Sequence, residues 1–136
     1  MNIPRLFISA LCFLCFTSSD YIQYVKLDPI ELENTKWKKF IEALIYVESG
    51  GDPYAVGRTN DAGVLQITPI YVEEVNRILG KNTFTLEDRF NTKRSLEMFC
   101  IYQQYYNPDK DIEEAIRLHN PRAGSWYKER VLKAMK

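Results

Sequence analysis

Glu48 is the residue in this sequence whose position most clearly suggests chemistry. Ile41, Leu44 and Glu48 are spaced i, i+3 and i+7, which places the three side chains on one face of a helix. A carboxylate on that face is costly to bury unless it is paired or protonated. Two outcomes are open: the helix end frays and Glu48 turns to water, or Glu48 lines a cleft. A carboxyl group in a desolvated cleft can donate a proton to a glycosidic oxygen.

Four further residues could take part in a site. Asp52 and Asp61 could supply a second carboxylate, but both stand among the Gly, Pro and Asn residues typical of turns, so we expect them to form turns. His119, the only histidine, lies on an apolar helix face, which is typical of a hydrogen-bonded core residue. Cys100 lies among apolar residues, and we expect a buried, inert thiol. A Cys100–His119 nucleophile pair is disfavoured because nothing indicates a lowered thiol pKa.

The elements that position these residues are predicted to be helices. Residues 52–68 are rich in Gly, Asn and Asp, which leaves room for a small hairpin at most. Capping residues, prolines and apolar periodicity predict five to seven helices. The first helical stretch begins near Asp28 or Thr35 and ends at Gly50. The next helix runs from Thr68-Pro69 to Gly80, and a short one starts at Thr85. A longer helix runs from Asn91 to about Tyr106, another runs from Asp111 to before Pro121, and the last starts at Ser125.

Size and charge narrow the class of protein. A chain of 136 residues is long enough for one domain with one core. Lys and Arg number 18, as do Asp and Glu, so the balance gives no basis for nucleic-acid binding. Phosphate-loop and metal-ligand motifs are absent. We therefore expect a monomer with no cofactor, no metal and no nucleic-acid partner.

The first 19 residues have the layout of a secretory signal peptide. Arg5 supplies a positive charge, residues 6–16 form an apolar run, and Thr17, Ser18 and Ser19 suit cleavage. The run is shorter than the ~20 residues of a membrane-spanning helix, although a buried N-terminal helix or a retained anchor stays open. We expect a signal peptide at 1–19, a domain at 20–136 with Cys100 as its single cysteine, and export to the periplasm or outside the cell.

The stretch from 41 to 69 resembles the lytic transglycosylases with an SLT domain, which belong to the lysozyme-like superfamily together with goose-type lysozyme. The resemblance rests on Glu48-Ser49-Gly50 followed by Gly63-Val64-Leu65-Gln66-Ile67-Thr68-Pro69. It implies a mainly α, lysozyme-like single domain in which Glu48 is catalytic. The glutamine of the family motif corresponds to Gln66.

A second family element, A-x-x-x-Y-N-x-G, matches less completely. Ala115 and Asn120 correspond to it, but His119 replaces the tyrosine and Pro121 follows in place of the usual glycine-rich turn. Asn120 therefore carries over, while the role of His119 is open. The resemblance implies Ser49, Gln66, His119 and Asn120 as substrate-binding residues. Aromatic side chains that could stack on sugars are Tyr54, Tyr102, Tyr105, Tyr106, Trp126 and Tyr127.

The resemblance also implies a reaction. Glu48 would protonate the oxygen of the β-1,4 bond between MurNAc and GlcNAc in peptidoglycan glycan strands, and would then act as the base while the 6-hydroxyl of MurNAc forms a 1,6-anhydro sugar. A lysozyme-type hydrolase, which generally needs a second carboxylate, is the alternative. A catalytically silent glycan-binding or assembly protein with the same fold is another. Cell-wall remodelling, a secretion or conjugation apparatus and a phage are equally compatible biological contexts.

Overall fold

The computed structural model of the chain describes residues 36–136. The predicted signal peptide at 1–19, the predicted domain start at residue 20 and the helix-start signals at Asp28 and Thr35 lie outside the described residues. Within 36–136, no helix combines the length and the apolar character needed to cross a membrane.

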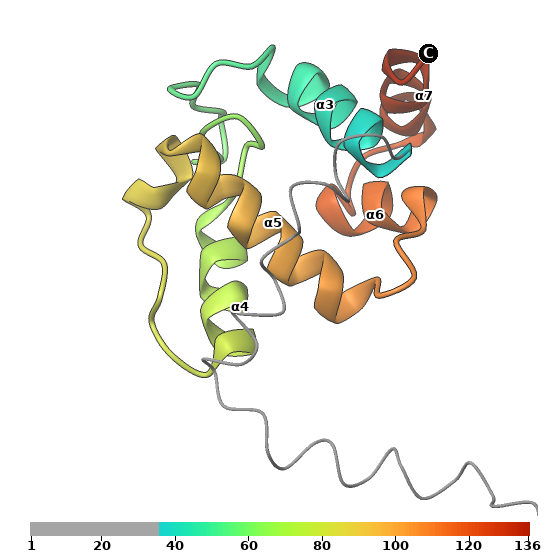
Figure 1. Cartoon of the computed structure of the whole chain (residues 1–136). Coiled ribbons are helices and arrows are strands. Elements are labelled where there is room, and N and C mark those ends of the chain that lie inside the picture. Colours follow the sequence, from blue (N-terminus) through green and yellow to red (C-terminus); the bar gives the residue numbers. More distant parts are fainter. Residues whose placement is uncertain (1–35) are drawn as a thin grey trace, which may run out of the picture.

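Five α-helices and one 3-10 helix make up the described part of the chain (Figure 1). No strand is formed between residues 36 and 136, where pairing is limited to isolated bridges of Ala62 with Val56 and with Ile67. The prediction of a mainly α domain with five to seven helices and at most a small hairpin is confirmed. The helices are α3 (Lys36–Ser49), α4 (Pro69–Leu79), η1 (Glu87–Phe90), α5 (Thr92–Tyr106), α6 (Ile112–His119) and α7 (Ser125–Ala134).

Three helices begin at capping residues visible in the sequence. Thr68, Asn91 and Asp111 cap α4, α5 and α6, and each side chain accepts a hydrogen bond from a backbone N–H of the first turn. The 3-10 helix η1 begins at Glu87 rather than at the predicted Thr85, and no side chain caps it. The last helix begins where predicted, but Ser125 does not cap it. Ser125 is its first residue, and Gly124 precedes it in extended conformation without a side-chain cap bond. The start of α7 therefore depends on packing rather than on a capping side chain.

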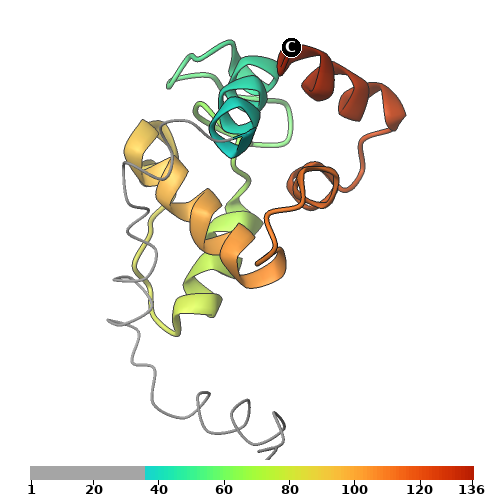
Figure 2. The same ribbon diagram turned by 45° about the vertical axis from the view of Figure 1, so that its right-hand side comes forward.

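The helices pack in two groups around one core. α3 packs on α7, which also contacts α6, while α5 contacts both α4 and η1. Figures 1 and 2 show α3 and α7 near one end of the molecule, and α4 with α5 toward the other. Side chains from both groups and from the segment between α3 and α4 are enclosed in the core, among them Phe40, Leu44, Leu65, Val75, Met98, Phe99 and Val131.

The segment between α3 and α4 folds back on itself and packs against η1. Gly63 N donates to Ala55 O at 2.8 Å, and Ala62 and Ile67 exchange backbone hydrogen bonds of 3.0 and 2.9 Å. Gly63 has φ of +77°, and a Cβ added there would lie 1.8 Å from the carbonyl oxygen of Arg89. Only glycine fits this contact between the loop and η1.

A buried arginine of η1 also holds this loop through its side chain. Arg89 is 4% exposed. Its Nη1 donates to Asn60 O at 2.5 Å and to Ile67 O at 3.3 Å, and its Nε donates to Leu86 O at 2.8 Å. Neutral carbonyl groups thus satisfy the buried guanidinium. Arg89 and Gly63 together fix the loop that runs from α3 to α4.

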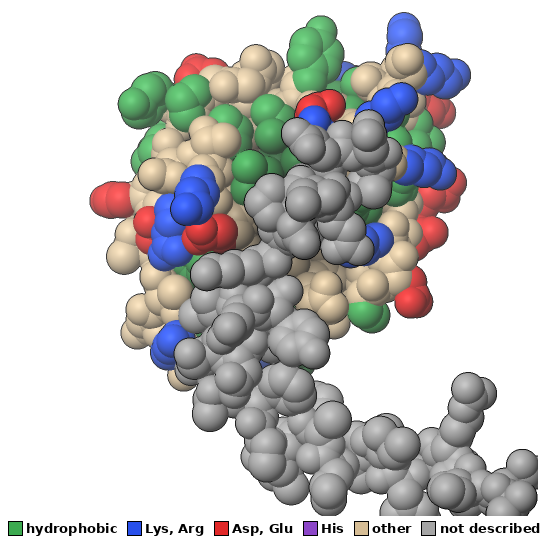
Figure 3. All heavy atoms as spheres, in the orientation of Figure 1, with side chains coloured by type: hydrophobic (Ala, Val, Ile, Leu, Met, Phe, Trp, Pro, Cys, Tyr) green, Lys and Arg blue, Asp and Glu red, His purple; other side chains and the backbone are tan. Residues whose placement is uncertain are grey.

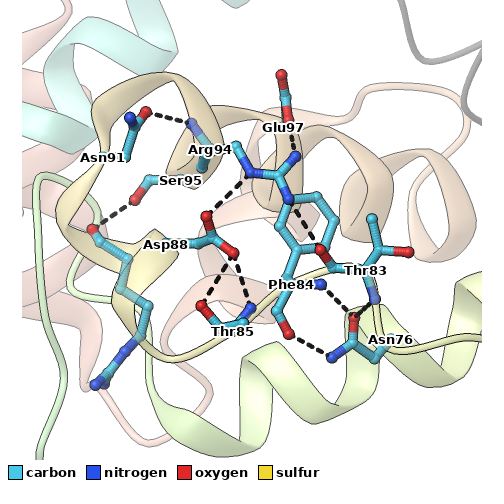
Figure 4. A network of polar contacts seen from close by, with 10 residues as sticks. Asn76, Thr83, Phe84, Thr85, Asp88, Asn91, Arg94, Ser95 and Glu97 are labelled. Carbon is cyan, nitrogen blue, oxygen red and sulfur yellow. Dashed lines mark hydrogen bonds and ion pairs between the residues drawn. The ribbon is translucent and has the colours of Figure 1, made fainter.

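Polar contacts around the connection between α4 and α5 hold η1 in place (Figure 4). Asn76 donates to Phe84 O at 2.8 Å and accepts from the N–H groups of Thr83 and Phe84 at 2.9 Å. The Arg94 guanidinium lies 4.0 Å from the Phe84 ring centroid and pairs with Asp88 at 3.2 Å. Asp88 of η1 is thus held to α5, and the segment that leads into η1 is held to α4.

The visible surface mixes the two signs of charge. Figure 3 shows Lys and Arg interspersed with Asp and Glu on the part of this face that is not drawn in grey. That arrangement agrees with the equal numbers of basic and acidic residues in the chain.

Candidate active site

Glu48 lies in the last turn of α3, one residue before the helix ends. Ile41 and Leu44 on the same helix face are buried, and the Glu48 side chain is only 13% exposed. The side chain is therefore not turned out to water but keeps a small accessible part. Two surface hollows of about 710 and 580 Å³ are lined by other residues. A groove in front of Glu48 stays a prediction.

Two side chains from later helices meet the Glu48 carboxyl group. Oη of Tyr127, on α7, donates a hydrogen bond to Oε1 of Glu48. Nε2 of His119, at the end of α6, lies 3.7 Å from the same oxygen. Tyr127 is 79 residues from Glu48 in the sequence, and the packing of α3 on α7 brings the two together. Tyr127 and His119 thus both lie against Oε1 of the Glu48 carboxyl group.

His119 is a neutral, hydrogen-bonded residue beneath the carboxylate. Its side chain is 4% exposed, and burial lowers its pKa, although the nearby Glu48 acts in the opposite direction. Nε2 lies 2.9 Å from the carbonyl oxygen of Leu65, which can only accept, so Nε2 carries the proton. The contact with Glu48 is therefore not an ion pair. His119 ties the carboxylate site to the loop after Gly63.

Ser49 makes its contacts with the backbone. Its hydroxyl lies 2.9 Å from Val64 O and 3.3 Å from Ile45 O, and it accepts from Gly51 N at 3.1 Å. These bonds join the end of α3 to the loop that carries Gln66. A contact of Ser49 with substrate stays a prediction.

Gln66 has an uncommon backbone conformation, and within residues 36–136 only the amide nitrogen of its side chain makes hydrogen bonds. Its φ is +48°, which is uncommon for a residue other than glycine and costs energy. Nε2 donates to Gly63 O at 2.9 Å and to Ala55 O at 3.2 Å. The side-chain amide thereby satisfies loop carbonyls, and Oε1 accepts no hydrogen bond within residues 36–136.

Asn120 follows α6 directly and uses its backbone to end the helix. Its N–H donates to Ile116 O at 3.1 Å, and its carbonyl accepts from Ala123 N at 3.1 Å. The side-chain amide makes no hydrogen bond within residues 36–136. Asn120 therefore has an unused donor and acceptor next to His119 in the chain.

The candidate second carboxylates form turns, as predicted. Asp52 Oδ1 accepts from Tyr54 N at 2.8 Å. Asp61 Oδ1 accepts from the N–H of Thr59 at 3.1 Å and from its hydroxyl at 2.6 Å. Both side chains close loops of their own, which is the ordinary role of aspartate in a turn.

Cys100 packs against the core as a protonated thiol. Burial raises the pKa of Cys100 to about 12, so the thiolate form is negligible at neutral pH. Cys100 is partly rather than fully buried, so the expectation of a buried thiol is met in part, and its lack of reactivity stays a prediction. The raised pKa also disfavours a Cys100–His119 nucleophile pair on physical grounds.

Comparison with known families identifies the fold that carries this arrangement. The family model described as Transglycosylase SLT domain matches residues 29–117. The chain belongs to this family. The resemblance seen in the sequence around Glu48 and Gln66 is therefore confirmed.

A curated relative of this SLT domain is membrane-bound lytic murein transglycosylase E of Buchnera aphidicola subsp. Acyrthosiphon pisum (strain APS). It is 33% identical over 67 residues, which are 48% of this chain and 30% of the relative. The matched part is thus less than one third of the relative's length. No solved structure shows a significant match to the chain.

The site extends beyond the part of the chain that the SLT model matches. Glu48 and Gln66 lie inside the match, which ends at residue 117. His119, Asn120 and Tyr127 follow it. Sequence reasoning named Tyr127 only as an aromatic face and missed its bond to Glu48. The sequence offered only a general signal for this bond: a buried tyrosine hydroxyl usually finds a hydrogen-bond partner.

Proposed function

We propose that this SLT domain is a peptidoglycan lytic transglycosylase that cleaves the MurNAc-β-1,4-GlcNAc bond and forms 1,6-anhydro-MurNAc. The observation that carries the proposal is the Glu48 carboxyl group at the end of α3. It is 13% exposed and is contacted on one oxygen by Tyr127 and His119. Membership of the SLT family and the printed name of the Buchnera relative support the same reaction class.

In the proposed mechanism one carboxyl group serves both steps. Protonated Glu48 gives its proton to the glycosidic oxygen while the bond from that oxygen to the anomeric carbon of MurNAc breaks. The 6-hydroxyl of the same MurNAc then attacks the anomeric carbon and passes its proton to Glu48. Glu48 ends in its starting state, and no water is consumed.

The use of a single carboxyl group favours this reaction over hydrolysis. A hydrolase generally needs a second carboxylate to activate water or to form a covalent intermediate. Asp52 and Asp61 accept hydrogen bonds within their own turns. Neither is therefore disposed to serve as the partner of Glu48.

We further propose that Gln66 and Asn120 bind the glycan. Oε1 of Gln66 and the side-chain amide of Asn120 make no hydrogen bond within the part of the chain that the structure describes. Ser49 and His119 direct their polar groups to the carbonyls of Val64 and Leu65. Their proposed contribution is to hold the loop against the end of α3.

The proposed substrate places the reaction at the cell wall. Peptidoglycan lies outside the cytoplasmic membrane, which agrees with the export expected from the first 19 residues. The glycan strand is the proposed partner. No other partner is needed for the chemistry, because the carboxyl group is contributed by this chain alone.

The decisive experiment is mass spectrometry of purified peptidoglycan digested with the protein. We expect muropeptides with 1,6-anhydro ends, which are lighter than reducing ends by one water. Glu48→Gln should reduce cleavage by at least about 10²–10⁴-fold, because the amide cannot donate a proton. The variant should still bind peptidoglycan.

Asp61→Asn is the matched control. Asn can still accept the hydrogen bonds from Thr59, so the turn and the activity should be retained. Reducing ends in the products together with an inactive Asp61→Asn variant would indicate a hydrolase. Binding without any cleavage by the wild-type protein would indicate a silent glycan-binding protein.

A further inference from the structure

The helix α7 exposes an aromatic ring and a positive charge side by side. Tyr127 and Val131 are four residues apart and buried, and α7 packs on α3. Trp126 and Arg130 have the same spacing, so they share a neighbouring face of the helix. Trp126 is 56% exposed, and Arg130 is exposed as well. One face of α7 is thus attached to the domain while the face beside it is open to solvent.

The two exposed side chains hold each other in place. Cζ of Arg130 lies 5.8 Å from the ring centroid of Trp126, within the range of a cation–π contact. The indole also lies close to Gly124, where an added Cβ would be 3.1 Å from Cδ1 of Trp126. Lys128 on the same helix pairs with Glu113, whereas Arg130 forms no ion pair within residues 36–136. Its guanidinium is therefore positioned by the indole and keeps its N–H groups for an external acceptor.

This pair lies at the edge of the candidate active site. The rings of Trp126 and Tyr127 meet edge to face with their centroids 6.0 Å apart, and Tyr127 contacts Glu48. Burial, and then Glu48, raise the pKa of Tyr127, while the positive charge of Arg130 acts in the opposite direction. Trp126 is thus separated from the Glu48 carboxyl group by a single side chain. A polymeric substrate bound at Glu48 extends beyond it, and this pair is within reach of the neighbouring unit.

The proposed substrate offers a chemical partner to each of the two side chains. A glycan strand presents sugar rings, and its MurNAc units carry stem peptides with free carboxylate groups. An exposed indole gives a flat apolar surface on which a sugar ring can lie. A guanidinium binds a carboxylate through two parallel hydrogen bonds. Because the indole already orients the guanidinium, less conformational entropy is lost when the carboxylate binds.

We propose that Trp126 and Arg130 form a subsite for peptide-bearing MurNAc, in which the indole stacks on the sugar and the guanidinium pairs with a carboxylate of the stem peptide. The proposal rests on the proposed function, which supplies the glycan, and it names peptide-bearing strands as the preferred substrate. Both residues follow the segment 29–117 that the SLT family model matches. Glu48 acts on the bond that both kinds of strand share, so the preference for the peptide comes from Arg130.

The test compares two substrates: glycan strands that carry stem peptides, and the same strands after an amidase has removed the peptides. We expect the wild-type kcat/KM to be about three- to tenfold higher on the peptide-bearing strands, which is the range of a partly exposed, charge-assisted pair. Arg130→Gln should lose this preference by becoming slower on the peptide-bearing strands alone. Lys133→Gln is the matched control, because it removes a positive charge from an exposed position of the same helix, and it should behave as the wild type. An equal loss on both substrates, or the same loss in Lys133→Gln, would overturn the proposal.

A second measurement does not depend on cleavage. The chain has two tryptophans, Trp126 and the 8% exposed Trp37, so the indole N–H signals in a ¹⁵N spectrum provide one reporter and one internal reference. The added ligand is the disaccharide GlcNAc-MurNAc with or without its peptide, which contains no MurNAc-GlcNAc bond to cleave. The Trp126 signal should shift at a lower concentration of the peptide-bearing form, and the Trp37 signal should stay in place. A Trp126 signal that responds to neither ligand would refute the subsite.

The two experiments separate the subsite from the proposed function. In Arg130→Gln, the Trp126 signal should respond equally to the two disaccharides, because the group that recognises the peptide is gone. If the wild-type protein forms no anhydro products while this dependence on Arg130 holds, the proposed function fails and the subsite stands. If anhydro products form from both kinds of strand at equal kcat/KM, the proposed function stands and the subsite is refuted.

Discussion

Replacing Gly63 by alanine should destabilise the domain by about 2–5 kcal/mol. The residue has φ of +77°, and the added Cβ would lie 1.8 Å from the carbonyl oxygen of Arg89. The left-handed backbone costs an L-residue about 1–2 kcal/mol. Relieving the overlap requires the loop or η1 to move, and forced overpacking typically costs about 1–3 kcal/mol more. Backbone cannot yield as a flexible side chain would, because Arg89 O also accepts a 2.7 Å bond from Ser95.

Gly80→Ala provides the matched control. Gly80 has a similar φ of +68°, but nothing lies within 4 Å of an added Cβ, so only the backbone cost of about 1–2 kcal/mol applies. Urea unfolding followed by far-UV circular dichroism measures both variants against the wild-type protein. Equal losses of stability in the two variants would refute the reasoning, since they would show that the loop does not press on η1.

Two further predictions concern buried titratable groups. Because the pKa of His119 is lowered by burial, the unfolded chain takes up a proton that the native state does not, so the free energy of unfolding should fall as the pH drops below about 6.5. In His119→Gln, urea unfolding at a series of pH values should give a free energy of unfolding that depends less on pH between about pH 5 and 7 than in the wild-type protein. An unchanged pH dependence would contradict the lowered pKa of His119. Burial raises the pKa of Cys100 to about 12, so a thiol reagent at neutral pH should react slowly with the native protein and rapidly in denaturant. Rapid labelling of the native protein would show that the thiol is accessible.

The helices could be predicted because their signals are local. Thr68, Asn91 and Asp111 each sit within three residues of the backbone N–H group that they cap. The last helix shows where this reasoning ends. Ser125 has a suitable side chain for a cap, yet Gly124 occupies that position. The packing of α7 on α3 involves residues far away in the sequence, and no local pattern contains it.

The candidate site divides in the same way. The position of Glu48 followed from helix periodicity, and the role proposed for it followed from the family resemblance. The bond from Tyr127 spans 79 residues, and the bond from Arg89 to Asn60 spans 29. Periodicity reports which side chains face inward, but not which of them meet across the core. Such contacts require the tertiary structure.

The hydrogen bonds of Arg89 affect how the domain responds to acid and to salt. An ion pair such as that of Arg94 with Asp88 weakens when acid protonates the carboxylate or when salt screens it. The hydrogen-bond partners of Arg89 are the backbone carbonyls of Asn60, Ile67 and Leu86, which neither titrate nor carry a net charge. The loop leading to Gln66 should therefore keep its attachment to η1 in acidic or saline surroundings that loosen the surface ion pairs.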